Sequence, residues 1–129
     1  MTFVAVLIGG LVGTGLRLAT AALVFPGSDF PWSTLLVNLV GSFVLGFLVA
    51  RVWPTAPNWL RAGLGTGLLG SFTTFSAVVV SLLTLTGSGL TVLAGIYLIV
   101  SLVLGFAAAL LGIRLGVAAP VDPPIGADE

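Results

Sequence analysis

Long apolar stretches alternate along the chain with short polar segments rich in proline and glycine. A helix needs about 20 apolar residues to cross a hydrocarbon layer of about 30 Å, and four stretches reach that length. The segments between them contain proline or glycine, which favour turns over helix. The pattern therefore predicts four membrane-spanning helices, over about residues 3–25, 32–52, 59–85 and 90–113.

The composition also indicates a membrane protein. Hydrophobic residues make up 58% of the 129 residues and charged residues only 6%, whereas a soluble domain carries about 25% charged residues. The formal net charge is zero, so nothing suggests binding to nucleic acid. We predict an all-α integral membrane protein, with a four-helix domain over residues 1–118 and a disordered, acidic, proline-rich tail over residues 119–129.

Residue types that catalysis and proton coupling require are missing. The sequence contains no His and no Cys, which excludes zinc sites built on these residues and acid–base catalysis by histidine. No Asp, Glu, Lys or His lies inside any predicted span, and arginine does not titrate. We therefore expect no enzymatic activity. A small multidrug exporter, which needs a carboxylate inside the membrane, is the disfavoured alternative.

Uncharged polar residues recur every fourth position on two predicted helices, which places them on one helix face. Thr34, Asn38 and Ser42 form such a stripe on the second helix, and Tyr97 and Ser101 form another on the fourth. A buried amide offers several hydrogen-bonding positions, so we interpret Asn38 as an anion ligand rather than a packing contact. Ser42 is interpreted as a helix-packing contact.

The first predicted helix carries Arg17 on the same face as Gly9 and Gly13. The two glycines permit close packing against another helix. Arg17 lies deep for an interfacial anchor, although its stem could reach the interface. Two interpretations stay open: an anchor near the helix end, or a cation that faces a polar vestibule and attracts anions.

The third predicted helix is unusually long and has a polar centre. Its roughly 27 residues would span about 40 Å, more than the hydrocarbon layer requires. Glycines crowd its first half, and the polar segment 70–76 lies near its middle. These features predict a helix that is broken near the midplane, with carbonyls available to a hard cation and N–H groups and hydroxyls available to an anion. The alternative is an intact helix whose glycines serve packing.

Three motifs stand out on these helices. They are Gly9-Gly-Leu-Val-Gly-Thr-Gly-Leu-Arg17, Thr34-Leu-Leu-Val-Asn-Leu-Val-Gly-Ser-Phe-Val-Leu-Gly46 and Gly67-Leu-Leu-Gly-Ser-Phe-Thr-Thr-Phe-Ser76. The chain resembles the Fluc (CrcB) fluoride channels of bacteria in these motifs and in the order and spacing of all four helices. The resemblance implies a fluoride-selective channel in the bacterial cell (inner) membrane, through which cytoplasmic fluoride leaves passively. It also implies an antiparallel dimer with two pores and a structural, non-transported Na⁺ at its centre.

The resemblance further implies roles for individual residues. The backbone carbonyls of Gly70 and Thr73 would hold the sodium ion, and Arg17 would lie in a vestibule. A phenyl edge carries positive electrostatic potential, so Phe75 can face an anion without a full charge. The implied fluoride pathway comprises Thr34, Asn38, Thr74, Phe75, Ser76, Tyr97 and Ser101.

Three positions depart from the family pattern. Val78 stands where the second pore phenylalanine is expected, Ser81 where an acidic residue is frequent, and Gly105 where a second serine follows on the fourth helix. These departures leave two arrangements open. Two copies of the chain form the pores together, or the chain is one subunit of an antiparallel heterodimer with a homologous partner.

Overall fold

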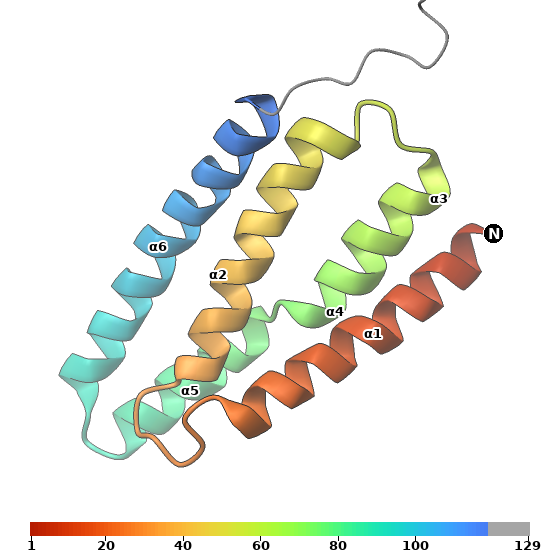
Figure 1. The fold of residues 1–129 in the computed structure, drawn as a ribbon. Coiled ribbons are helices and arrows are strands. Elements are labelled where there is room, and N and C mark those ends of the chain that lie inside the picture. Colours follow the sequence, from red (N-terminus) through yellow and green to blue (C-terminus); the bar gives the residue numbers. More distant parts are fainter. Residues whose placement is uncertain (119–129) are drawn as a thin grey trace, which may run out of the picture.

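The computed structural model describes residues 1–118 and is entirely helical within that range, apart from connecting loops (Figure 1). Four helical spans are long and apolar enough to cross a membrane. They are Thr2–Leu23, Trp32–Val52, Asn58–Gly87 and Thr91–Ala118. The predicted all-α chain with four helices long and apolar enough to span a membrane is thereby confirmed. The tail predicted over residues 119–129 lies outside the described residues.

Two of the four spans are single α-helices, α1 (Thr2–Leu23) and α6 (Thr91–Ala118). The second span consists of α2 (Trp32–Phe47) followed by the π-helical turn η1 (Leu48–Val52). The third span is divided into α3 (Asn58–Arg61), the π-helical segment η2 (Ala62–Leu69), α4 (Gly70–Phe72) and α5 (Phe75–Gly87). Helix α6 runs past its predicted end near residue 113, because Arg114 is followed by more apolar residues and proline comes only at position 120.

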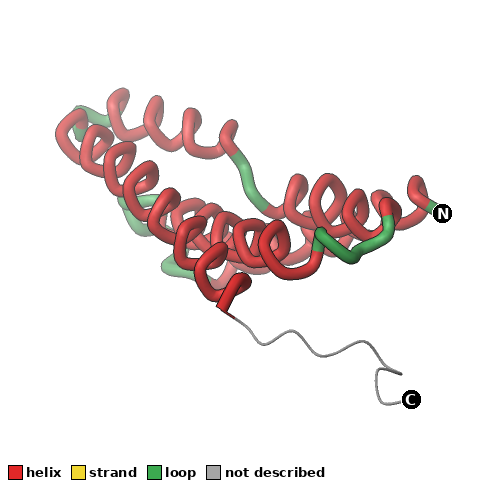
Figure 2. The backbone as a smooth tube through the Cα atoms, turned by 90° about the horizontal axis from the view of Figure 1, so that it is seen from above, coloured by secondary structure: helices red, strands yellow, loops and turns green. Residues whose placement is uncertain are grey.

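The third span does not follow one continuous helical path. Thr73 (φ −78°, ψ 156°) and Thr74 (φ −154°, ψ 122°) have extended backbones between α4 and α5. A non-helical stretch separates the two helical parts of this span in the tube view (Figure 2). Helix α5 then restarts at Phe75, because the Thr74 side chain accepts a hydrogen bond from the Ala77 N–H and caps the new helix.

Glycines bring the helices into backbone contact. Helix α1 packs along η2, and α2 packs along α6. A Cβ atom added at Gly9 would collide with the Gly63 carbonyl of η2, and one added at Gly46 would collide with the Ala109 carbonyl of α6. Gly112 of α6 is equally close to the main chain of α2. Small residues of this kind let membrane helices approach closely.

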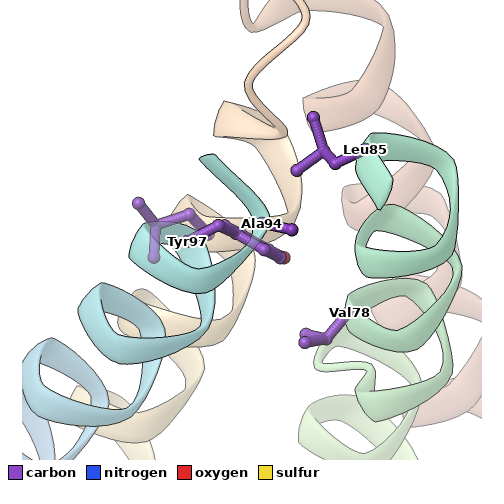
Figure 3. Packing of buried hydrophobic residues seen from close by; sticks show 5 residues of the cluster. Val78, Leu85, Ala94 and Tyr97 are labelled. Carbon is purple, nitrogen blue, oxygen red and sulfur yellow. The ribbon is translucent and has the colours of Figure 1, made fainter. Parts of the chain in front are cut away.

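A small apolar core lies where α5 and α6 meet the beginning of α2 (Figure 3). Its buried members are Leu35, Val78, Leu85, Ala94 and Tyr97. Large apolar side chains remain exposed on every span, including Phe3 at 87% and Phe75 at 80%. A single copy of the chain therefore presents an apolar surface suited to lipid or to a second chain.

The contact at Gly112 predicts a position-specific effect on stability. Gly112→Ala places a methyl group against the α2 main chain, and such overpacking costs about 1–3 kcal/mol. The matched control is Gly95→Ala, because Gly95 lies on the same helix with open space around it. Thermal unfolding in detergent should show a lower midpoint for Gly112→Ala and an unchanged or higher one for Gly95→Ala. Equal midpoints would contradict the close approach of α2 and α6.

Candidate functional site

A cavity of about 750 Å³ lies between α2, the third span and α6. It forms where α2 and η2 make few direct contacts. The lining brings together six of the predicted site residues, from three different spans: Asn38, Gly70, Thr73, Thr74, Phe75 and Ser101. Two of the positions that depart from the family pattern, Val78 and Gly105, also line it.

Asn38 connects α2 to the extended backbone of the third span. The Thr74 N–H donates to Asn38 Oδ1 at 2.9 Å, and Asn38 Nδ2 donates to the Thr74 carbonyl at 3.0 Å. This reciprocal pair resembles the pairing of two residues on neighbouring strands. One of the two Nδ2 hydrogens remains for another acceptor. Asn38 therefore holds the interruption in place and also lines the cavity.

Two N–H groups near the interruption do not make their usual helical bonds. In a continuous α-helix, each N–H donates to the carbonyl four residues earlier. The Thr74 N–H would then bond to Gly70, but it donates to Asn38. The Ala77 N–H would bond to Thr73, but it donates to Thr74 Oγ1 at 3.1 Å. The carbonyls of Gly70 and Thr73 consequently lose the donors that a helix would give them.

The carbonyl of Leu69, the residue before Gly70, accepts two hydrogen bonds and is fully occupied. Leu69 accepts from the Thr73 N–H at 2.9 Å and from Thr73 Oγ1 at 2.8 Å. Ser76 Oγ lies 3.1 Å from Thr74 Oγ1, which places the Ser76 hydroxyl beside the start of α5. The hydroxyls of the Thr-Thr-Phe-Ser motif thus mostly organise the local backbone.

Gly41 is a residue of this site that the sequence analysis did not single out. A Cβ atom at position 41 would collide with the methyl group of Thr73. The absence of a side chain there lets α2 reach the interruption, three residues after Asn38. The available signal was the Asn-x-x-Gly spacing within the second motif.

Tyr97 and Ser101 form a buried polar pair on α6. Tyr97 is 0% exposed, and the edge of its ring contacts Phe30 at a centroid distance of 5.5 Å. Within the described chain, Tyr97 Oη and Ser101 Oγ are buried without a hydrogen-bond partner. Ser81 and Ser101 both lie close to the Tyr97 hydroxyl. These hydroxyls retain the capacity to bind a small polar species.

Arg17 and Thr34 lie apart from the main cavity. They border a smaller pocket of about 170 Å³ together with Thr74 and Ala77. Thr74 also lines the larger cavity, so this residue stands between the two spaces. The structure thus places Arg17 near Thr34 and Thr74 without bringing it to Asn38 or Phe75.

The ligands that the site can offer to a cation are neutral oxygens. Among residues 1–118 there is no group of three or more His, Cys, Asp or Glu side chains that could hold a metal ion. The carbonyls of Gly70 and Thr73 instead supply oxygen atoms, which hard cations prefer.

Comparisons with known proteins place these residues in a family context. A model of the family described as "CrcB-like protein, Camphor Resistance (CrcB)" matches residues 4–113. The chain is 42% identical over 112 residues to a protein of Xanthomonas euvesicatoria pv. vesicatoria named "Fluoride-specific ion channel FluC", with 84% of each chain covered.

Two further relatives carry the same name. The Rhizobium johnstonii protein is 43% identical over 112 residues, which cover 83% of this chain and 89% of the relative. The protein of Roseiflexus sp. (strain RS-1) is 39% identical over 116 residues, which cover 87% of this chain and 94% of the relative. All three are named as ion channels and not as enzymes, in agreement with the expectation from the sequence.

The unpartnered hydroxyl of Tyr97 leads to a prediction about stability. Tyr97→Phe keeps the ring and its contact with Phe30 but removes a buried polar group, so the unfolding midpoint in fluoride-free detergent should be unchanged or higher. Thr73→Val is the comparison, because it removes a hydroxyl that donates to Leu69 and should cost about 1 kcal/mol. An equally large decrease for Tyr97→Phe would mean that the hydroxyl has a partner in the assembled protein.

Proposed function

We propose that this chain, which belongs to the CrcB-like protein family, is a fluoride-selective channel. In this proposal cytoplasmic fluoride leaves the cell passively, which lowers its intracellular toxicity. The observation that carries the proposal is that Asn38 of the second motif meets Thr74 and Phe75 of the third motif in one cavity. The proteins named fluoride-specific ion channels, 39–43% identical to this chain, give the permeating ion.

The chemistry of the lining suits a small anion. Fluoride gives up its water only where other donors replace it, and the cavity offers the second Nδ2 hydrogen of Asn38 and the Ser101 hydroxyl. Tyr97, one helical turn before Ser101, is fully buried and does not line the cavity, so its hydroxyl would have to act from behind Ser101. Phe75 lines the cavity with its side chain 80% exposed, so its positive ring edge is available to an anion. At the smaller pocket Thr34 and Thr74 add hydroxyls, and Arg17 would attract anions. Ser76 lines neither pocket, but its hydroxyl lies beside that of Thr74.

Passive movement fits the residues of the four spans. None of the spans contains Asp, Glu, Lys or His, so they hold no carboxylate, amine or imidazole for coupling to protons. A membrane potential that is negative inside drives an anion outward by about 2.3 kcal/mol per 100 mV. The same argument disfavours a small multidrug exporter, which depends on an intramembrane carboxylate.

A structural, non-transported Na⁺ forms the second part of the proposal. Its ligands would be the backbone carbonyls of Gly70 and Thr73. The fit is supported by the diverted N–H groups of Thr74 and Ala77, which leave these carbonyls available. Both residues line the cavity. Bound sodium would compensate carbonyls that are costly to leave unsatisfied inside a membrane.

The third part concerns assembly in the membrane. Two chains in antiparallel orientation would bring their interruptions together near the midplane of the bacterial cell membrane, with the ion at the centre of the dimer. The exposed Phe75 and the apolar surface of α1 support contact with another chain or with lipid. Val78 and Gly105 line the cavity, so the departures from the family pattern fall where they would alter a pore. This placement keeps a heterodimer with a homologous subunit as the alternative.

Ion efflux from liposomes tests the channel directly. Liposomes that contain this chain alone, with sodium present, should release fluoride rapidly and retain chloride. Asn38→Asp adds a fixed negative charge beside the cavity, and charge repulsion should reduce fluoride release to the background leak. Gly95→Ala, on an open surface of α6, is the control variant and should release fluoride like the unmodified chain.

The outcomes of the efflux experiment separate the alternatives. Fluoride release by Asn38→Asp at the unmodified rate would refute the proposed pathway. If well-folded dimers of the unmodified chain release no fluoride, and release begins when a homologous chain is added, the heterodimer would be established. The absence of fluoride release from both preparations would refute the proposed channel.

Removal of sodium tests the cation site. A ligand that binds only the folded protein stabilises it by about 2.7 kcal/mol at a hundredfold excess over its dissociation constant. The unfolding midpoint should therefore be higher in sodium than in a bulky organic cation at the same ionic strength. Identical unfolding curves in the two salts would contradict a structural sodium site.

A further inference from the structure

We infer that Asn38 and Thr74 are positioning residues for the cation site, because their side chains capture the two N–H groups that would otherwise occupy the carbonyls of Gly70 and Thr73. This inference rests on the proposed sodium site. It assigns to Asn38 a role that is separate from any contact with fluoride. The cation site would then depend on α2 as well as on the third span.

The first captured group is the Thr74 N–H. It donates to Asn38 Oδ1 at 2.9 Å, and the same amide returns a bond to the Thr74 carbonyl at 3.0 Å. Two bonds to one residue fix the orientation of that peptide segment more firmly than either bond alone. With its donor held by α2, the Gly70 carbonyl cannot regain the bond that a continuous helix would provide.

The second captured group is the Ala77 N–H. Thr74 Oγ1 accepts it at 3.1 Å and caps α5. Without this hydroxyl, the nearest backbone acceptor in a continuous helix would be the Thr73 carbonyl. The cap therefore stabilises the start of α5 and keeps the second carbonyl available.

The loss of donors is specific to the carbonyls of Gly70 and Thr73, because the neighbouring Leu69 carbonyl keeps its donors. Leu69 receives two donors from Thr73, at 2.9 and 2.8 Å, and has little capacity left for a cation. Gly41 adds a steric condition, because only a residue without a side chain lets α2 come this close to Thr73. The Leu69 carbonyl is therefore fully hydrogen-bonded, whereas the carbonyls of Gly70 and Thr73 lack their usual helical donors.

Two matched pairs of variants test the inference. Asn38→Asp keeps an oxygen that can accept from the Thr74 N–H, whereas Asn38→Leu has a similar size and no acceptor. Thr74→Ser keeps the capping hydroxyl, whereas Thr74→Val replaces it with a methyl group. Ser42→Ala, one helical turn after Asn38 on the same face, controls for changes in the cavity wall.

The measurement is the unfolding midpoint of each purified dimer across a sodium titration at constant ionic strength. Release of one captured N–H group, that of Thr74 in Asn38→Leu and that of Ala77 in Thr74→Val, should raise the sodium concentration at half-maximal stabilisation by about tenfold. Thr74→Ser and Ser42→Ala should retain the response of the unmodified chain. In Asn38→Asp the half-maximal sodium concentration should not rise, because the carboxylate still accepts from the Thr74 N–H and its charge attracts a cation. Asn38→Asp would then lose fluoride release while keeping its response to sodium.

A merely structural role gives a different result. In that case Asn38→Leu and Thr74→Val would unfold at lower temperature in every salt, with the half-maximal sodium concentration unchanged, and the inference would be overturned. If Asn38→Leu does not fold, the Thr74 pair decides. If the unmodified chain itself shows no response to sodium, the proposed cation site fails, and the inference fails with it.

Discussion

A hydrocarbon layer offers no water to backbone N–H and C=O groups, so a helix interrupted within it must find partners in the protein. Midway along its 30-residue third span, this chain has extended backbone at Thr73 and Thr74. Two side chains satisfy the donors there: the Asn38 amide bonds to Thr74, and the Thr74 hydroxyl bonds to Ala77. The acceptors that lose those donors belong to residues on the wall of the main cavity. The proposed cation site and the proposed anion pathway would therefore share one local backbone geometry.

Close helix packing makes this geometry possible. Asn38 can reach Thr74 only because α2 approaches the interruption at Gly41, where a side chain would meet Thr73. Further along α2, Gly46 fixes its contact with α6 in the same way. Helix α6 carries Tyr97 and Ser101, whose hydroxyls are buried beside the core. Small residues thus set the distances between the spans, and the few polar side chains act at those fixed distances.

Part of this organisation could be predicted from the sequence. The four spans follow from the length of the apolar stretches, and Asn38, Tyr97 and Ser101 follow from polar residues at helical spacing. The partner of Asn38 could not be predicted, because a contact across 36 positions depends on how α2 crosses the third span. The π-helical geometry of η2 has no counterpart in a pattern of apolar positions. In the sequence Gly41 is one glycine among 18, and its role becomes clear only from its contact with Thr73 in the structure.

In the proposed site, the side chains of Asn38 on α2 and of Thr74, which caps α5, keep the carbonyls of Gly70 and Thr73 open for a cation. An experimental structure of the assembled protein in sodium tests it most directly, with a matched preparation in a bulky organic cation. The account predicts density for an ion in contact with both carbonyl oxygens in sodium only, with Asn38 bonded to Thr74 in the same map. A continuous helix through Thr73 and Thr74, or an ion bound elsewhere with these carbonyls hydrogen-bonded, would contradict it.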